Sequence, residues 1–451
     1  PVTIDPLATS PSWTAEGELS YCTYFGINIA TAGDVNGDGY SDVILGAPGF
    51  DNDQIGEGRA YLYLGSVSGL LLTPSWMAEG NQNTALFGDA VSTAGDVNGD
   101  GYSDVIVGAH QYGNVEEYEG KIYLYLGTPS GLSLSPAWTA ESDQTSAHFG
   151  TAVATAGDVN GDGYSDIIVG APYFDNDHDN EGAVFVWHGS ASGMGASGTP
   201  TNADWSAESD QAIAFFGVSV STAGDVNGDG YSDVIVGSYC YDNGQPDEGR
   251  AYLYLGSASG LSLSPAWTAE SDQASAFFGV SVSTAGDVNG DGYSDVIVGS
   301  YCYDNGQPDE GRAYLYLGSA SGLSLSPAWT AESDQASAFF GVSVATAGDV
   351  NGDGYSDVVV GSHYYDNGQI DEGRAYLYLG SASGLSTSPS WTNESDQAGA
   401  QYGFVSTAGD VNGDGYSDFI VGASYYINGG GNIGAAFVYH GGPSGPNWVT
   451  N

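Results

Sequence analysis

The sequence predicts an all-β fold, a seven-bladed β-propeller built from four-stranded antiparallel blades. The main observation is a nine-residue segment, Asp-Val-Asn-Gly-Asp-Gly-Tyr-Ser-Asp, which occurs seven times at intervals of 61 to 67 residues. Self-similarity at a fixed long period is typical of arrays and propellers. Each repeat also contains four short strand-like segments, and none shows the periodicity of a helix.

The repeat at residues 208–269 shows the four expected strands in order. Apolar residues alternate over 216–222, which predicts a half-buried strand that leads into the nine-residue segment. The apolar run 234–236 predicts a second strand, buried on both faces. Residues 250–255 form the expected third strand and 266–269, around a tryptophan, a short fourth strand. Polar turn residues separate the second strand from the third.

Closure of the seven repeats into a ring is expected, because an open row of sheets would expose unpaired edges. The fourth strand with its tryptophan occurs eight times, so one copy is spare: either Trp13 or Trp448 could complete blade seven. We expect the N-terminal copy, within residues 1–16, to do so. The chain is then one domain, residues 1–451, with approximate repeats at 17–78, 79–140, 141–207, 208–269, 270–331, 332–393 and 394–451.

The composition excludes several classes of partner. Asp and Glu outnumber Lys and Arg by 56 to 5, and the formal net charge is −51. Such a surface repels nucleic acid and anionic membranes, so neither is an expected partner. No apolar run reaches the roughly 18 residues of a membrane span, so no membrane insertion is expected. The chain starts at Pro1 without a visible signal peptide, as a mature or trimmed product does.

The nine-residue segment predicts one Ca²⁺ site per repeat, up to seven in all. Side chains at positions one, three, five and nine and the carbonyl at position seven supply only oxygen ligands, which favours Ca²⁺ over zinc or copper. An EF-hand is excluded, because its loop needs a glutamate where the first copy has Leu45. A metal-free hairpin is disfavoured, because the clustered carboxylates would repel one another. Calcium loops suit the extracellular space, so we expect an extracellular or cell-surface protein.

The expected calcium ligands occupy the same five positions in every copy. They are Asp34, Asn36, Asp38, Tyr40, Asp42, Asp96, Asn98, Asp100, Tyr102, Asp104, Asp158, Asn160, Asp162, Tyr164, Asp166, Asp225, Asn227, Asp229, Tyr231, Asp233, Asp287, Asn289, Asp291, Tyr293, Asp295, Asp349, Asn351, Asp353, Tyr355, Asp357, Asp410, Asn412, Asp414, Tyr416 and Asp418.

A Phe-Gly pair precedes each calcium segment, and Gly-Ala-Pro follows it at 46–48 and 170–172. The pairs are Phe25-Gly26, Phe87-Gly88, Phe149-Gly150, Phe216-Gly217, Phe278-Gly279 and Phe340-Gly341, with Tyr402-Gly403 in the last repeat. Over the whole chain this pattern resembles the FG-GAP repeats of integrin α-subunit propellers. The resemblance implies Ca²⁺ in the hairpin between the first two strands of each blade, on the lower face. It also implies binding of protein or glycan through the upper-face loops, after strands two and four.

Two further sets of residues recur with the repeat. Aromatic residues follow the second strand, where they either pack between blades or contact a ligand; they are Tyr173, Phe174, Tyr239, Tyr241, Tyr301, Tyr303, His363, Tyr364, Tyr365, Tyr425 and Tyr426. All five basic residues begin the third strand, where we expect structural ion pairs; they are Arg59, Lys121, Arg250, Arg312 and Arg374.

No arrangement of His, Ser, Cys and acidic residues indicates a catalytic site, so we expect no enzyme. The favoured hypothesis is an extracellular, calcium-stabilised adhesion or recognition module that binds glycan or protein. The alternative is a structural subunit of a surface layer, sheath or extracellular filament, in which the chain would self-assemble. Near-identical blades and the spare fourth strand motivate this alternative, because a terminal strand can dock on a neighbour by strand addition.

Overall fold

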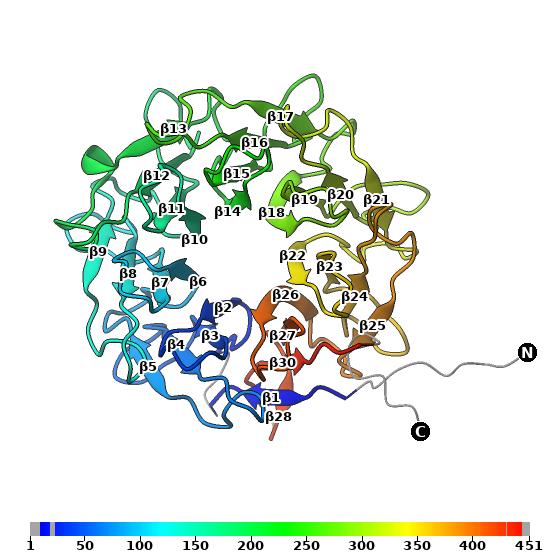
Figure 1. The fold of residues 1–451 in the computed structure, drawn as a ribbon, viewed down its shortest axis with the longest axis horizontal. Helices are drawn as coiled ribbons and strands as arrows, with labels where there is room; N and C mark the ends of the chain where they lie inside the picture. The colour runs from blue at the N-terminus through cyan, green and yellow to red at the C-terminus, as the bar shows by residue number, and fades with distance from the viewer. Residues whose placement is uncertain (1–9, 19–22, 430, 444–451) are drawn as a thin grey trace, which may run out of the picture.

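The computed structural model describes residues 10–18, 23–429 and 431–443, which form a ring of seven four-stranded antiparallel sheets (Figure 1). In each blade, strand one is innermost and strand four is outermost (Figure 1). The predicted all-β fold is confirmed. Among the described residues the one helical element is a short 3₁₀ turn, Pro200–Asn202, within the longest repeat. No helix in these ranges is long and apolar enough to span a membrane.

The strands follow one pattern in all blades. Their bounds are β2 (Ile29–Gly33), β3 (Asp42–Ala47), β4 (Arg59–Tyr63) and β5 (Trp76–Glu79) in blade one; β6 (Ala90–Gly95), β7 (Asp104–Ala109), β8 (Lys121–Tyr125) and β9 (Trp138–Glu141) in blade two; β10 (Ala152–Gly157), β11 (Asp166–Ala171), β12 (Ala183–Trp187) and β13 (Trp205–Glu208) in blade three; β14 (Ser219–Gly224), β15 (Asp233–Ser238), β16 (Arg250–Tyr254) and β17 (Trp267–Glu270) in blade four; β18 (Phe278–Gly286), β19 (Asp295–Ser300), β20 (Arg312–Tyr316) and β21 (Trp329–Glu332) in blade five; β22 (Ser343–Gly348), β23 (Asp357–Ser362), β24 (Arg374–Tyr378) and β25 (Trp391–Glu394) in blade six; β26 (Tyr402–Gly409), β27 (Asp418–Ala423), β30 (Ala435–Tyr439) and β1 (Trp13–Glu16) in blade seven.

Blade seven is completed by the N-terminal strand. β1 pairs antiparallel with β30, and Trp13 lies opposite Val438. The Trp13 indole also donates a 3.0 Å hydrogen bond to the Leu71 carbonyl in blade one. β1 therefore joins the first and last blades, while Trp448, the other candidate, lies outside the described residues.

The hydrophobic core lies between the blades rather than within any one of them. The cluster around Phe278, for example, combines Trp267 of blade four with Val296 and Tyr314 of blade five. Phe278 is fully buried, edge-on to Tyr314 at 5.1 Å. Its neighbour Gly279 approaches blade four so closely that a Cβ on Gly237 would lie 1.9 Å from the Gly279 carbonyl oxygen. The Phe-Gly pair thus supplies a buried ring and a close backbone contact.

Two details differ from the simple four-strand pattern. A small hairpin, β28 (Ile427–Asn428) with β29 (Gly431–Asn432), extends the loop between strands two and three of blade seven. Cys240 and Cys302, which occupy equivalent positions in blades four and five, are free cysteines. Cys22 lies outside the described residues. We call the face with the loops between strands one and two the lower face, and the opposite face the upper face.

Candidate cation loops and the upper face

The first aspartate of each nine-residue segment organises its loop. Asp34 Oδ1 accepts hydrogen bonds from the backbone N–H groups of Gly37 at 2.7 Å and Asp38 at 3.1 Å. Asp34 Oδ2 accepts the Gly39 N–H at 2.8 Å. Gly37 and Gly39 have φ values of 72° and 89°, which glycine adopts at little cost. The same bonds occur in the other six loops.

The side chains at positions three and five lie beside the first aspartate at the exposed tip of the loop. Asn36 Oδ1 accepts the Asp38 N–H at 2.9 Å, and the Asn36 amide donates to Asp38 Oδ2 at 2.9 Å. Asp38 Oδ1 in turn accepts the Tyr40 N–H at 3.1 Å. The loop therefore holds its oxygen atoms in place through its own backbone.

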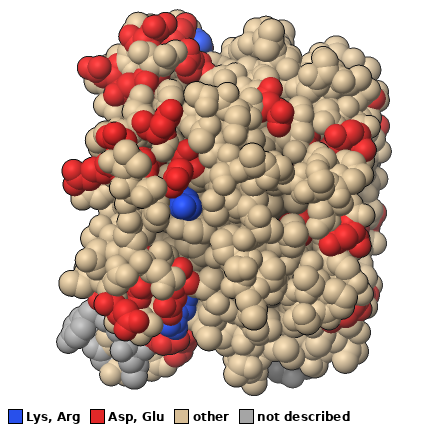
Figure 2. All heavy atoms as spheres, turned by 90° about the vertical axis from the view of Figure 1, so that its left-hand side faces the viewer, with Lys and Arg blue, Asp and Glu red and all other residues tan. Residues whose placement is uncertain are grey.

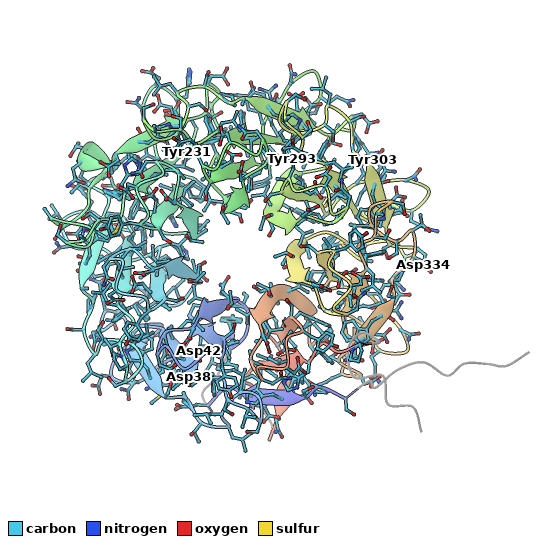
Figure 3. The ribbon with its side chains drawn as sticks, viewed as in Figure 1. Asp38, Asp42, Tyr231, Tyr293, Tyr303 and Asp334 are labelled. Carbon is cyan, nitrogen blue, oxygen red and sulfur yellow. The ribbon has the colours of Figure 1, made fainter. Side chains whose placement is uncertain are left out.

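The ninth residue is buried, in contrast to the loop tip. Asp42 is fully buried and lies at the start of β3, whereas Asp38 is exposed at the loop tip; Figure 3 labels both residues in blade one. Its Oδ2 accepts the Val35 N–H at 2.9 Å, and its Oδ1 accepts the Gly65 N–H at 2.8 Å. Equivalent pairs of bonds occur in every blade.

Burial raises the pKa of Asp42 to about 7, because the charged form loses its hydration. The two backbone hydrogen bonds lower this pKa, and the charges of Asp38 and Asp34 raise it. The same causes act on the equivalent residues Asp104, Asp233, Asp295 and Asp357, with pKa values of about 7, and on Asp418 at about 8. Burial also raises the pKa of Asp166, to about 6, but there the nearby His188 lowers it.

No Lys or Arg side chain pairs with these loops in the part of the chain that the structure describes. Every ion pair among the described residues lies on the upper face, and none includes an aspartate of the nine-residue segments. Figure 2, a side view of the ring, shows acidic residues toward both faces, with the visible Lys and Arg in the half nearer one of them. The lower-face carboxylates therefore face one another without a counter-charge.

The donor set of each loop fits a hard cation such as Ca²⁺. Each carboxylate oxygen has two acceptor sites, so the backbone hydrogen bonds leave acceptor capacity on Asp34, Asp38 and Asp42. In no described loop do all three carboxylates bring an oxygen within 4.8 Å of the other two. The predicted ligand residues of each loop thus lie together at the lower end of their blade. Asp42 differs from the others because it is buried and accepts two backbone hydrogen bonds.

The tyrosine and serine of the segment have a role that the sequence analysis did not foresee. The ring of Tyr102 packs against Gly37 of the preceding blade, where a Cβ would lie 2.7 Å from the ring. The Ser103 N–H donates to the Asp34 carbonyl at 2.9 Å. Equivalent bonds of 2.9–3.0 Å join all seven blades, and the Ser41 N–H closes the circle on the Asp410 carbonyl. The loops therefore also connect adjacent blades.

The five basic residues form the expected ion pairs on the upper face. Each pairs with the glutamate that ends strand four of its own blade: Arg59 with Glu79, Lys121 with Glu141, Arg250 with Glu270, Arg312 with Glu332 and Arg374 with Glu394. Each cation also lies over an aromatic ring of the preceding loop, as Arg312 does over Tyr303 at 3.9 Å. This arrangement explains why Tyr241, Tyr303 and Tyr365 are buried and pack within the protein.

A second set of aromatic residues forms a continuous belt on the upper face. In most of the belt, an aromatic residue that follows strand two of one blade contacts the aromatic residue that precedes the Phe-Gly pair of the next blade. The aromatic side chains therefore form a series that runs from blade to blade. Adjacent ring centroids are 4.6–5.8 Å apart, from His110 through His148, Tyr173, Phe215, Tyr239, Phe277, Tyr301, Phe339, Tyr364 and His363 to Phe404. We call these residues the aromatic belt. Most of its side chains are half-buried, and Tyr173 is 38% exposed.

The residue before each Phe-Gly pair adopts a left-handed backbone. The φ values lie between 51° and 57° at Tyr24, Leu86, His148, Phe215, Phe277, Phe339 and Gln401. A non-glycine residue in this region costs on the order of 1 kcal/mol or more, and such strain is concentrated at functional sites. Spacing alone did not single out these residues, although their position beside Phe-Gly is constant.

His363 is expected to make the protein less stable in acid. Burial lowers the pKa of His363 to about 4, so the folded protein keeps it neutral while the unfolded chain binds a proton below about pH 6.5. Burial of neutral His363 therefore costs no protonation free energy above pH 6.5, and the free energy of unfolding decreases as the pH falls from 6.5 toward 4. We expect His363→Phe to remove up to about 1.4 kcal/mol per pH unit from this slope.

Urea unfolding between pH 4.5 and 7 in calcium measures that slope. His178→Phe, at an exposed loop position, is the matched control and should leave the slope of the parent protein unchanged. Equal slopes for His363→Phe and the parent protein would contradict the prediction.

Models of two known repeat families match the repeats of this chain. A model of the FG-GAP repeat matches residues 25–63, 87–125 and 149–187, and a model of the FG-GAP-like repeat matches 225–298, 287–360 and 349–421. Each match contains a segment whose loop and flanking strands are described above. Together the matches extend from blade one into blade seven.

Integrin alpha chains are among the similar proteins. Integrin alpha-4 of Xenopus laevis is 32% identical over 228 residues, which is 50% of this chain and 20% of the relative. Integrin alpha-V of Gallus gallus is 33% identical over 251 residues, 53% of this chain and 22% of the relative. The matched region thus spans about a fifth of each relative's length. With its repeat matches and seven blades, this chain belongs to the FG-GAP repeat family of integrin alpha-like β-propellers.

Proposed function

We propose that this chain is an extracellular, calcium-stabilised adhesion or recognition module that binds a protein or glycan through its upper face. The observation that carries the proposal is the aromatic belt. Most of its aromatic side chains are only half-buried, and accessible aromatic rings stack on sugars and anchor protein contacts. The strained backbone beside each Phe-Gly pair supports a functional role for this face. The resemblance to integrin alpha chains supports the same class of function.

In this proposal the two faces have different tasks. The seven lower-face loops each bind Ca²⁺ through the side chains at positions one, three, five and nine and the carbonyl at position seven. The cation neutralises carboxylates that have no basic partner, and the hydrogen bonds between loops then hold adjacent blades together. A rigid ring keeps the belt in one conformation, which reduces the entropy lost when a ligand binds.

Binding to panels of immobilised glycans and secreted proteins tests the proposal. We expect the protein in calcium to bind members of one class, and the double variant Tyr173→Ala/Phe277→Ala to bind at least about tenfold more weakly, as hot-spot truncations do. Leu263→Ser is the matched control, because Leu263 is 93% exposed between strands three and four, away from the belt. Equal binding by the belt variant and the parent protein, or no binding to either panel, would contradict the proposal.

A further inference from the structure

A separate group of acidic side chains lies on the upper face, where blade six meets blade seven. Glu372 precedes β24, Glu394 ends β25, and Asp396 lies in the turn that follows. One carboxylate oxygen of each lies within 4.8 Å of the other two. Among the residues that the structure describes, this is the one group of three potential metal ligands that meets this distance. It is at the opposite end of the blade from the nine-residue loop.

Glu372 has a buried oxygen without a partner. The residue is fully buried, and its Oε1 accepts the Asn367 N–H. Its Oε2 is buried and makes no hydrogen bond. Burial raises the pKa of Glu372, and the charges of Glu394 and Asp396 raise it further, although the backbone N–H groups of Asn367 and Gln369 lower it. An unpaired buried carboxylate oxygen is costly, so this atom points to a missing positive group.

The equivalent acids of blade five are arranged differently. There the residue that corresponds to Asp396 is Asp334, at the outer side of the ring (Figure 3), and it accepts a 3.4 Å hydrogen bond from the Tyr365 hydroxyl. In blade four, Asp272 accepts the Tyr303 hydroxyl at 3.2 Å. The buried glutamates of these two blades, Glu248 and Glu310, have no buried oxygen without a partner.

Blade seven provides no such hydroxyl contact for Asp396. Tyr426 occupies the corresponding position but packs edge-on to Phe437, with ring centroids 5.6 Å apart. Asp396 has a left-handed φ of 55°, whereas Asp272 and Asp334 are not in this region. Asp396 is exposed, so the group is open to solvent on one side. The junction of blades six and seven thus differs from the junctions that follow blades four and five in backbone as well as in hydrogen bonding.

The charges of the group match a divalent cation. Arg374 pairs with Glu394 Oε1 and lies 3.8 Å over the Tyr365 ring. Glu394 Oε2 accepts the Asn367 amide at 2.9 Å. One guanidinium against three carboxylates leaves two negative charges uncompensated. Carboxylate oxygens are the ligands that Ca²⁺ prefers, and an exposed aspartate leaves room for water ligands.

We propose that Glu372, Glu394 and Asp396 bind one further divalent cation, of the Ca²⁺ class, on the upper face. Glu372 supplies a buried oxygen, Glu394 an oxygen at the end of β25, and Asp396 the solvent-facing ligand. This site is distinct from the seven lower-face loops, and it does not depend on them or on the proposed ligand of the belt.

Crystals soaked in Tb³⁺ test the site directly through anomalous scattering. We expect a peak between the three carboxylates in the parent protein and in Asp334→Asn, the matched control from blade five. The peak should be absent in Asp396→Asn, a substitution at an exposed residue that leaves the core intact. No peak at this position in the parent protein, or an equal peak in Asp396→Asn, would overturn the proposal.

Calcium stoichiometry in solution gives an independent measurement. After equilibrium dialysis at saturating Ca²⁺, atomic emission should show one ion fewer per chain for Asp396→Asn than for the parent protein and for Asp334→Asn. Equal stoichiometry in all three proteins would overturn the proposal. Thermal melts of each variant in calcium verify that the folded protein is compared.

Discussion

Removal of Ca²⁺ is expected to lower the melting temperature of this protein by on the order of 20 °C. A ligand that binds only the folded state stabilises it by about 2.7 kcal/mol per site when its concentration is 100-fold above Kd. Seven such sites contribute roughly 19 kcal/mol, and a chain of 451 residues has an unfolding entropy near 0.95 kcal/mol/K. The large effect follows from the number of sites rather than from unusual affinity.

The structure explains why the loss of stability in one loop is expected to affect the adjacent blades. Without cations, Asp34 and Asp38 repel each other and the buried Asp42, which has no basic partner. The same loop donates its Ser41 N–H to the Asp410 carbonyl of blade seven. Repulsion in one loop therefore weakens the contact with the adjacent blade, and unfolding remains cooperative.

Calorimetry in millimolar calcium and in excess chelator measures this shift. Asp229→Asn removes one carboxylate from blade four and should lower the melting temperature in calcium by about 3 °C, a seventh of the total. In chelator the same variant should melt no lower than the parent protein, because it carries one fewer repelling charge. Melting temperatures that agree in calcium and chelator would contradict the assignment of metal to the loops.

Much of the fold could be predicted because each repeat carries its own local signals. The segment from Asp225 to Asp233 and the alternation before it specify a hairpin, and seven copies specify a ring. The contacts between blades were harder to predict, since they join residues from different repeats. Gly65 donates to Asp42 from 23 residues away, and Tyr102 packs on Gly37 of the preceding blade.

The contacts on the upper face were even harder to predict from the sequence. The sequence left open whether the aromatic residues after strand two pack or contact a ligand, and the structure divides them. Tyr303 lies under Arg312, whereas its near neighbour Tyr301 stacks in the belt against Phe277. Two tyrosines that are only two positions apart in the sequence therefore lie in different surroundings. The left-handed backbone at Phe277 has no signature in composition, because the residue before Phe-Gly varies from blade to blade.

The acidic group at Glu372 could not be recognised from sequence at all. Its residues are repeated in blade five as Glu310, Glu332 and Asp334, so the pattern alone treats the two blades as equal. The difference arises in the next blade, where Tyr426 turns to Phe437 and leaves Asp396 without the hydroxyl. A difference in the packing of one blade therefore changes the hydrogen bonding of the blade before it.

A chain that lacks residues 1–16 is expected to be less stable and to associate with other copies, because blade seven loses its outermost strand. β1 is the outermost strand of blade seven, and its removal exposes the edge of β30 to other molecules. Trp13 is buried and lies edge-on to Tyr63 of blade one at 4.9 Å. Loss of a buried tryptophan alone costs about 3–5 kcal/mol, and the four paired residues of β1 add to it. We expect a lower melting temperature and oligomers formed through the open edge.

Light scattering and thermal melts in calcium test this expectation, with Trp267→Ala as the matched control. Trp267 of blade four donates to the Ser324 carbonyl at 2.9 Å and packs edge-on to Tyr316 at 4.8 Å, as Trp13 does with its own partners. The control should therefore lose stability and remain a monomer, because its ring stays closed. A synthetic peptide of residues 10–18 should return the truncated chain to a monomer. A truncated chain that is monomeric and melts like the parent protein would contradict the prediction.

The same experiment separates the two hypotheses about function. β1 already pairs within its own ring, so assembly by donation of this strand would require it to leave β30. A structural subunit that assembles in this way would form filaments as the full chain, and truncation would abolish them. A recognition module would behave in the opposite sense, with a monomeric full chain and association only after truncation. The direction of the change therefore decides between self-assembly through β1 and a closed ring whose upper face remains available for a ligand.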